Sequence, residues 1–405
     1  MAKPNFTLPN KPAIKSGSIL SYNYTDDFTF VPTPLTFNRD SAATRVNEKG
    51  LIETVGADQP RIDYLNDSNG ALLLEPSRSN IITNSNSSNL NFTLDNTSMT
   101  YNSITSPDGE NNGILFKQTG STASNSAYNF GLTTADGTYT YSIFIKANDS
   151  TKFRFYSSNG TALTQDFNPQ EMTEGVVSGA LNLKFESYGN DWFRVSFTRT
   201  LSSASHHRFS IYPDRNNTQK SVYIFGLQIE SNASYATSYI PTAGSTVTRL
   251  GETANNAGDV NVFNSEEGVL YAEIAALADD SSFRAISISD ASYSNRCTLR
   301  YGGASNRTNI LVVSSGLTVF DGNSTSLNVL NYNKIVLKYK QNDFSFWING
   351  FEVATGTSGN TPSGLSQLQF ADALGNGTPF YGKVKNVKVF NKALTDRELE
   401  ILTIQ

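Results

Sequence analysis

The sequence predicts an all-β protein in which an extended N-terminal segment is followed by two antiparallel β-sandwiches, with one short helix near the C-terminus. Three observations support this fold class. The 405 residues include 19 Tyr and 25 Phe among abundant Asn, Ser, Thr and Gly, and only 17% are charged. Such a mixture of β-favouring aromatics and turn formers is typical of strands joined by many loops. Apolar and polar residues also alternate with period two in segments about 8–12 residues apart, and a single segment carries a helix-start signal.

Residues 1–36 form the extended N-terminal segment. Five prolines interrupt it, and proline cannot donate to a sheet ladder. It nevertheless carries more apolar side chains than a disordered tail would, among them Phe6, Leu8, Ile14 and Tyr22. Two interpretations follow. Either the arm lies on its own domain, or these side chains anchor it in a partner or a neighbouring subunit, because a proline-broken arm cannot bury them alone.

Residues 37–85 contain short strands and turns, too small to form a core. Residues 61–65 and 71–75 flank a glycine-ended turn at 66–70, which predicts a hairpin. The acidic and amide residues in this turn lack the alternate spacing and distal Glu of an EF-hand, so calcium is not expected here.

Two longer regions carry the alternating strand pattern. Residues 86–249 are expected to form the first sandwich and residues 263–405 the second. The small polar residues of 250–262 predict a linker between them. The clearest strand candidates are 138–146, 152–156, 192–199, 208–212 and 222–230 in the first region, and 267–275, 334–340, 343–351 and 382–391 in the second.

The helix-start signal lies at the end of the second region. Thr395 and Glu398 have the spacing of a capping box, in which each side chain bonds the other residue's backbone N–H. The sequence therefore predicts a short helix from this point.

Composition excludes several functions. The net charge is −5 and no Lys/Arg cluster occurs, so nucleic acid is not an expected partner. Cys297 is the single cysteine, so an intrachain disulfide is impossible. The sequence shows no apolar signal-peptide region and no run of about 18 apolar residues, so neither secretion nor membrane insertion is expected.

No catalytic, metal-binding or cofactor pattern is found. His206 and His207 are adjacent, and adjacent strand residues point to opposite faces, so one metal ion could not easily take both. The acidic pairs at 266–267 and 279–280 diverge for the same reason, whereas a glycosidase needs two converging carboxyl groups. Glu267 and Glu273 could share a face, but they lie on an opening strand that reads as structural. We expect no enzymatic activity and no cofactor.

Glycan binding remains open, because sugar rings stack on aromatic side chains. Mid-strand aromatics usually fill a sandwich core instead, and the sequence does not rank the two roles. The candidate platforms are Tyr156, Tyr188, Trp192, Tyr212, Tyr293, Tyr301 and Trp347.

Four consecutive motifs resemble a signature of bacteriophage virion proteins, above all head and tail fibres. They are FNRDSAATR at 37–45, GLIETV at 50–55, PRIDY at 60–64 and LLLEPSRSN at 72–80. Two further resemblances follow along the chain. DWFRVSF at 191–197, with the stretch from 226 to 249, resembles a carbohydrate-binding-module-like jelly roll. WING at 347–350, GKVKNVKVFN at 382–391 and ALTDREL at 393–399 resemble a concanavalin A-like or laminin-G-like domain.

These resemblances imply a non-enzymatic structural protein on the surface of a phage particle, made in the host cytoplasm. It would be a head fibre or decoration protein that presents lectin-like jelly-roll and concanavalin A-like sandwiches to host or environmental glycans. Its N-terminus would attach to capsid or tail proteins, and fibres of this kind are commonly homotrimers. The alternatives are a tail fibre or receptor-binding protein and, from a different class, a polysaccharide depolymerase.

Overall fold

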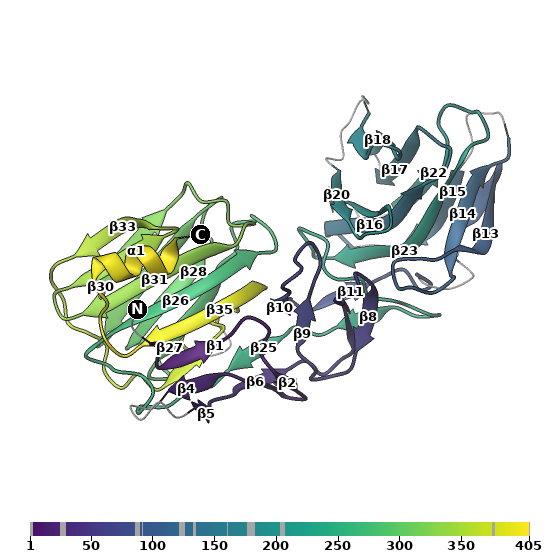
Figure 1. The fold of residues 1–405 in the computed structure, drawn as a ribbon. Coiled ribbons are helices and arrows are strands. Elements are labelled where there is room, and N and C mark those ends of the chain that lie inside the picture. Colours follow the sequence, from purple (N-terminus) through teal and green to yellow (C-terminus); the bar gives the residue numbers. More distant parts are fainter. Residues whose placement is uncertain are drawn as a thin grey trace.

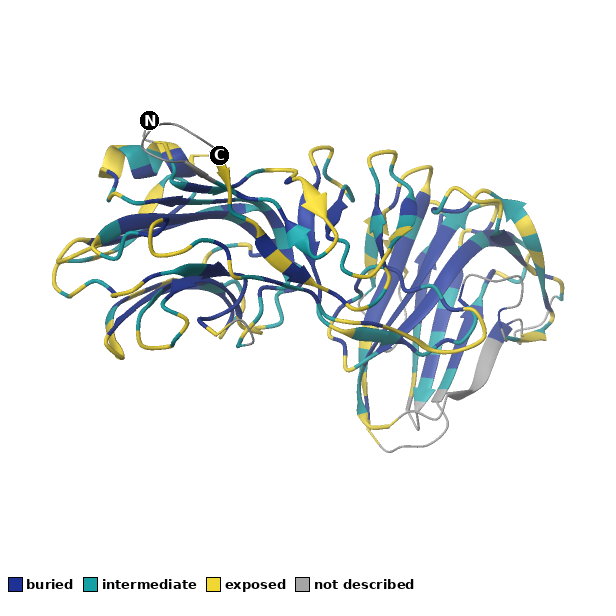
Figure 2. Ribbon diagram, turned by 90° about the horizontal axis from the view of Figure 1, so that it is seen from below, coloured by how far each residue is buried: buried dark blue, intermediate teal, exposed yellow. Residues whose placement is uncertain are grey.

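The computed structural model describes residues 3–24, 30–85, 90, 92–120, 126–132, 135–159, 161–175, 183–202, 207–374 and 377–404. The chain forms two antiparallel β-sandwiches side by side, with the N-terminal strands running along one sandwich and between the two (Figure 1). Figure 2 shows buried residues concentrated on the strands of both sandwiches and exposed residues in the connecting loops. The predicted all-β fold class is confirmed.

The first sandwich pairs a sheet at the junction with a distal sheet that faces away from it (Figure 1). The junction sheet has the order β13 (Thr97–Ile104), β14 (Gly113–Gln118), β23 (Ser221–Ser231), β16 (Gly137–Ala147), β21 (Trp192–Leu201), β20 (Lys184–Ser187), with β11 (Arg78–Asn80) and β24 (Val247–Arg249) added beside β23. The distal sheet has the order β12 (Thr93–Asp95), β15 (Ser126–Leu132), β22 (His207–Tyr212), β17 (Phe153–Asn159), β18 (Thr161–Asn168), β19 (Thr173–Glu174).

Aromatic side chains fill the space between these two sheets. Phe153, Phe155 and Phe209 alternate with polar residues along their strands and are at most 1% exposed. The Tyr141 ring stacks on Phe197 of the neighbouring strand β21, with 4.7 Å between ring centroids, and on Phe209 of the distal sheet across the core, with 5.3 Å between centroids. Because the core takes every second residue, the intervening residues of β17 and β22 must face outward.

The second sandwich also has two sheets. The larger has the order β33 (Phe351–Gly356), β32 (Phe344–Ile348), β31 (Asn333–Lys340), β26 (Glu267–Ala276), β35 (Gly382–Phe390), β1 (Phe6–Leu8), β4 (Tyr22–Tyr24), β5 (Phe30–Pro32), with β10 (Ala71–Leu74) and β9 (Arg61–Asp63) added beside β35. The other has the order β30 (Leu317–Ser324), β29 (Thr308–Ser314), β28 (Arg296–Tyr301), β27 (Arg284–Ser289), β34 (Gln367–Gln369).

Helix α1 (Asp396–Thr403) covers the outer side of the larger sheet and begins where the capping box predicts. The Thr395 side chain accepts from the Glu398 backbone, and the Glu398 carboxylate accepts from the Thr395 N–H at 3.0 Å. Leu399 and Leu402 pack against Trp347 of β32, which fixes the helix on the sheet.

The N-terminal arm is part of the second sandwich. Phe6 and Leu8, at 0% and 1% exposure, lie on β1, which pairs with β35 and β4. Tyr22 lies partly buried on β4, and Ile14 lies on β2 (Ile14–Lys15) with 37% exposure. The expectation that these apolar side chains need a partner protein is therefore corrected for Phe6 and Leu8, because the chain's own core covers them.

The region between arm and first sandwich forms short strands. β3 (Ser18–Ile19) and β6 (Leu35–Asn38) join β2 in a small sheet, and β7 (Ala43–Val46) pairs with β8 (Ile52–Val55). The predicted hairpin is confirmed, because Ala71 to Leu73 of β10 pair antiparallel with Arg61 to Asp63 of β9.

The segment of residues 250–262, for which the composition predicts a linker or a connecting loop, is packed into the structure in its middle part, although Leu250 and Val260 are 40% and 64% exposed. β25 (Thr253–Asn255) pairs with β6, and Ala254 and Ala257 are fully buried. Glu252 is only 1% exposed. The small residues of this segment are explained by close packing rather than by flexibility.

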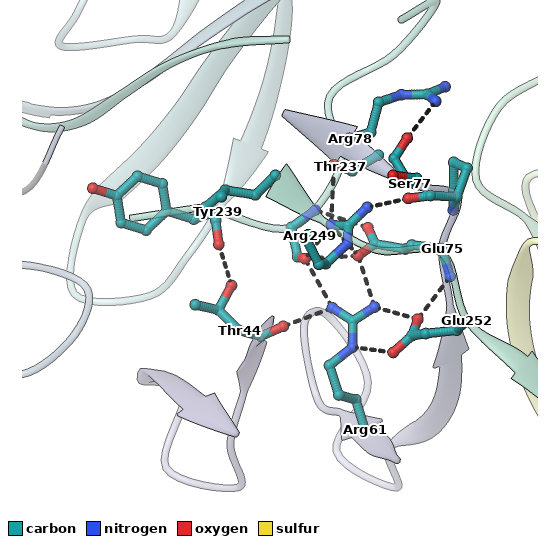
Figure 3. Close-up of polar contacts among 12 residues, drawn as sticks. Thr44, Arg61, Glu75, Ser77, Arg78, Thr237, Tyr239, Arg249 and Glu252 are labelled. Carbon is teal, nitrogen blue, oxygen red and sulfur yellow. Dashed lines mark hydrogen bonds and ion pairs between the residues drawn. The ribbon is translucent and has the colours of Figure 1, made fainter. Parts of the chain in front are cut away.

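The four motifs of residues 37–80 supply Arg39, Arg61 and Glu75 to a buried ionic network at the junction between the sandwiches, and Arg249 and Glu252 complete it. In Figure 3 the Arg61 guanidinium contacts the carboxylates of Glu75 and Glu252, and Arg249 also contacts Glu75. The distance from Arg61 Nη2 to Glu75 Oε2 is 2.8 Å, as is that from Arg249 Nη1 to the same oxygen. Arg39 Nη1 approaches Glu252 Oε1 to 2.7 Å.

Three arginines thus face two carboxylates, and backbone carbonyls and the hydroxyls of Thr237 and Ser238 accept from most of the other donors, while Arg249 Nε has no hydrogen-bond partner among the described residues. Arg61 donates to the Thr44 carbonyl at 2.7 Å, and Arg249 donates to that of Pro76 at 2.6 Å. The Glu75 backbone N–H donates to Glu252 at 2.8 Å. These pairings stabilise the buried charges, because an unpaired charge at this depth would cost several kcal/mol. Arg39, Arg61 and Glu75 therefore have a structural role, as part of the joint between the two sandwiches.

The network predicts a loss of stability in acid. Burial alone raises the pKa of Glu75, but the charges of Arg249 and Arg61 and hydrogen bonds from Ser238 outweigh it and lower the pKa to about 2. An unfolded Glu titrates near 4.3, so the contribution, on the order of 3 kcal/mol, is present above about pH 4.5 and disappears as the pH falls toward 2.

Thermal unfolding followed by circular dichroism across this pH range measures the loss. The Glu75→Gln variant should be less stable at neutral pH but should lose less further stability in acid. Equal acid sensitivity of both proteins would contradict the assignment.

Candidate functional site

Four of the seven candidate aromatics are buried and cannot stack on a ligand. Trp192 is 1% exposed and donates from Nε1 to the Thr105 carbonyl at 3.1 Å. Trp347 is 8% exposed beneath α1. Tyr188 meets the Phe144 ring edge-on with 4.8 Å between centroids. Tyr301, expected in a loop, ends β28 at 1% exposure and donates to the Ile274 carbonyl. These rings fill cores because neighbouring elements cover them.

Tyr156 and Tyr212 remain accessible and lie on the outward side of the distal sheet. They occupy the neighbouring strands β17 and β22 and are partly exposed, whereas Phe155 and Ile211 beside them point into the core. Tyr156 pairs with Ser210, two residues before Tyr212, so the tyrosines are diagonal neighbours. Diagonal residues lie roughly 7–8 Å apart, so the two rings share one surface.

Arginines surround these two rings. The Arg208 guanidinium carbon lies 5.4 Å from the Tyr156 ring centroid, and that of Arg215 lies 5.0 Å from the Tyr212 centroid. Arg154 pairs across the ladder with Tyr212. Cation–π contacts at these distances hold the guanidinium groups and the rings together. We call the outward side formed by Arg154, Tyr156, Arg208, Tyr212 and Arg215 the tyrosine face.

One carboxylate belongs to this face. Asp166 of β18 lies opposite Arg154, and its side chain is 1% exposed. Arg154 Nη2 donates to Asp166 Oδ2 at 2.8 Å, and Lys152 Nζ lies 3.4 Å from the same oxygen. The hydrogen bond with Asp166 raises the pKa of Arg154. Burial lowers the pKa of Arg215, and the nearby charge of Arg154 lowers it further.

Sequence reasoning found the tyrosines of this face but missed its arginines. The signal was the period-two pattern itself: Arg154 precedes Tyr156 by two positions, and Arg208 precedes Tyr212 by four, so each pair shares a side of its strand. The missing information was the pairing of β17 with β22, which brings the two strands together from more than 50 positions apart.

Tyr293 is the one accessible candidate in the second sandwich. It is 44% exposed in the loop before β28, and the Arg296 guanidinium carbon lies 5.2 Å from its ring centroid. Arg296 Nε lies 3.1 Å from Asp372, so the charge of this arginine is balanced locally. The loop at Tyr293 therefore presents one accessible aromatic ring, whereas the tyrosine face presents two.

A groove lies between the two sandwiches. Three adjoining cavities of about 210, 440 and 100 Å³ share lining residues there, among them Lys184, Glu186, Arg194, Ala236 and Leu277, and Lys383 lines the smallest. The surrounding protein raises the pKa of Glu186 by removing water. Lys383 is engaged with Asp63 at 3.0 Å. The groove therefore has polar groups but lacks a pair of exposed aromatic platforms.

The residues considered for metal binding or catalysis are placed as follows. No group of three or more His, Cys, Asp or Glu side chains within the described ranges is arranged to hold a metal ion. His206 and the His207 side chain lie outside what the structure describes. Glu267 pairs with Lys340, and Asp280 pairs with Arg284. Burial raises the pKa of the Cys297 thiol, which makes it a poor nucleophile.

No helix among the described residues has the length and hydrophobicity needed to cross a bilayer.

A family model described as the concanavalin A-like lectin/glucanases superfamily matches residues 262–400. The match covers the strands of the second sandwich from β26 onward and most of helix α1. These residues form a concanavalin A-like domain, as the resemblance of the C-terminal motifs implied. No curated protein matches the chain.

Several solved structures are distantly similar to this chain. The CBM40 domain of the Ruminococcus gnavus IT-sialidase has 15% sequence identity and a TM-score of 0.32, with 37% of this chain and 94% of that chain covered. Domains LG4-5 of the mouse laminin alpha1 chain have 10% identity and a TM-score of 0.24, with 69% and 91% covered. Domain 4 of the AbnA arabinanase from Geobacillus stearothermophilus has 15% identity and a TM-score of 0.31, with 42% and 83% covered. These values are too low to indicate a ligand.

Proposed function

We propose that this chain is a non-enzymatic, glycan-binding structural protein displayed on the surface of a phage particle, as a head fibre or decoration protein. The tyrosine face carries the glycan-binding part of this proposal. Tyr156 and Tyr212 present two rings on one solvent-facing surface, and the polar groups beside them can reach sugar hydroxyls. Aromatic rings with a few placed polar groups are what sugar recognition requires.

The particle context is supported by the four ordered motifs of residues 37–80. The buried network adds a physical reason for their residue types, since Arg39, Arg61 and Glu75 hold the two sandwiches together. A rigid joint suits a protein that holds binding domains away from a surface. A tail receptor-binding protein is the alternative position. A depolymerase is disfavoured, because Glu267 and Asp280 are each engaged in ion pairs rather than paired with a second carboxyl group.

The glycan-binding part is tested with the full-length protein on an array of bacterial and animal oligosaccharides. The double variant Tyr156→Ala/Tyr212→Ala should bind roughly 10- to 100-fold more weakly, because each stacking contact contributes about 1 kcal/mol or more. Tyr293→Ala is the matched comparison, an exposed, arginine-stacked tyrosine in the other sandwich. Loss of binding in Tyr293→Ala with retention in the double variant would move the site to the second sandwich. Absence of binding to every glycan would contradict the proposal.

The particle role is tested by imaging and by mass. Labelled antibody against the second sandwich should decorate the head of purified particles, whereas tail labelling would favour the receptor-binding alternative.

We expect a homotrimer, in which three copies multiply weak glycan contacts through avidity. Light scattering of the purified chain and copy number on intact particles measure this stoichiometry, and a monomer in both would remove the trimer.

A further inference from the structure

The charges of the tyrosine face are unbalanced. Lys152, Arg154, Arg208 and Arg215 supply four positive charges on or beside β17 and β22, while Asp166 of β18 and Asp95 of the edge strand β12 supply two negative charges on this side of the sheet. Asp166 is shared by Arg154 and Lys152, at 2.8 and 3.4 Å from the same oxygen.

Arg208 and Arg215 are stacked on the two tyrosine rings, which carry no net charge. The buried Asp214 lies next to Arg215 and accepts from the backbone N–H groups of residues 216, 218 and 220. When Asp214 is counted with Asp95 and Asp166, these four cations still outnumber the three carboxylates. The whole chain has a net charge of −5, so this concentration of positive charge is local.

The positions of the cations also matter. Arg154 lies directly across the ladder from Tyr212, and the Arg215 backbone N–H donates to the Lys152 carbonyl at 2.8 Å, which holds the three cationic residues close together. Burial and the charge of Arg154 both lower the pKa of Arg215, as expected for a guanidinium crowded by a like charge. An anion bound here would relieve that repulsion.

We propose that the tyrosine face binds acidic glycans, with a sugar ring stacked on Tyr212 and the sugar carboxylate paired with Arg215 and Arg154. This inference rests on the proposed glycan-binding function and names its ligand class. A guanidinium is planar and matches a carboxylate with two parallel hydrogen bonds, and it can remain stacked on an aromatic ring while doing so. The arrangement thus places a ring platform and an anion receptor within one sugar residue of each other.

The test uses the full-length protein and matched pairs of oligosaccharides. Sialyllactose and oligogalacturonate are compared with their carboxyl-reduced forms by calorimetry. We expect the acidic forms to bind about 10- to 100-fold more tightly, the gain of a charge-assisted hydrogen bond. Raising NaCl from about 50 to about 500 mM should weaken the acidic forms and leave the reduced forms nearly unchanged.

The variant Arg215→Gln should lose most of this preference, so that its affinities for the acidic and the reduced form of one sugar differ much less than those of the unmodified protein. Its control is Arg300→Gln, which removes an arginine 5.0 Å from the Phe283 ring in the second sandwich. Equal binding of acidic and reduced sugars would overturn the acidic-ligand inference and leave glycan binding intact. Sulfated sugars that bind as tightly as carboxylated ones would overturn the carboxylate assignment. If none of these sugars bound and the array were also negative, the proposed function itself would fail.

Discussion

Replacing Glu252 by Gln is expected to destabilise the folded protein by about 3–5 kcal/mol, because it removes one partner of a buried ionic network. The Glu252 side chain is fully buried and accepts from Arg39 at 2.7 Å and from Arg61 Nε at 2.8 Å. It also accepts from the backbone N–H of Glu75. Gln keeps the shape of the side chain but turns an NH₂ group toward these donors. Three arginines would then face Glu75 alone.

Urea unfolding followed by far-ultraviolet circular dichroism measures the change in the free energy of unfolding. The matched control is Glu53→Gln, which breaks the partly exposed pair with Arg45 and should cost no more than about 1 kcal/mol. Residues 250–262 should also become accessible to protease in the Glu252 variant, because β25 follows directly. Similar stability losses in both variants would mean that the network is not an essential joint.

Replacing Phe6 by Ala is expected to cost about 3–5 kcal/mol, as for other fully buried phenylalanines. Phe6 is 0% exposed, pairs with Val389 of β35 and packs 6.0 Å from the Phe263 ring. Ile14→Ala is the control, since Ile14 is 37% exposed on a short strand and its loss should cost less than about 1 kcal/mol. Chemical denaturation of both purified variants gives the comparison.

This experiment also separates the two interpretations of the N-terminal arm. If Phe6 serves the chain's own core, the variant is unstable in solution without any particle. If Phe6→Ala is as stable as the unmodified protein but fails to join particles, the residue anchors the chain in a partner instead. Deleting residues 1–36 is a poorer test, because it removes β1 to β5 together and uncovers β35.

The features that could be predicted from the sequence depend on neighbours in the chain. The capping box of Thr395 and the turn after Asp63 are local, and the period-two pattern identified the long strands. What could not be predicted depends on distant pairing. No local property of Phe6 reveals β35, and nothing in the small residues around Ala254 reveals β6. A buried strand and a mobile linker can share a composition when close packing demands small side chains.

The difference between local signals and distant strand pairing also explains how much of the tyrosine face could be predicted from the sequence. The period-two alternation places Arg154 and Tyr156 on one side of β17, and Arg208 and Tyr212 on one side of β22. It does not reveal that the two strands are neighbours, so the shared surface could not be predicted. Alternation also could not distinguish the exposed Tyr156 and Tyr212 from the buried Trp192 and Tyr301, because β-strands that are buried on both sides carry aromatic residues on both faces. Part of the covering of Trp192 comes from distant residues, because its indole donates to the Thr105 carbonyl 87 positions earlier and packs in a cluster with Val46 and Ile52.

The pairing of β1 with β35 has a consequence for biosynthesis. The Asn391 backbone N–H donates to the Asn5 side chain, 386 positions earlier in the sequence. A ribosome adds about 5–20 residues per second, so the segment around Phe6 waits roughly 20–80 seconds before its partner strand is made. During that interval an apolar strand without its neighbour is exposed to the crowded cytoplasm. Translation speed and chaperone supply, rather than final stability, would then limit the yield of this protein.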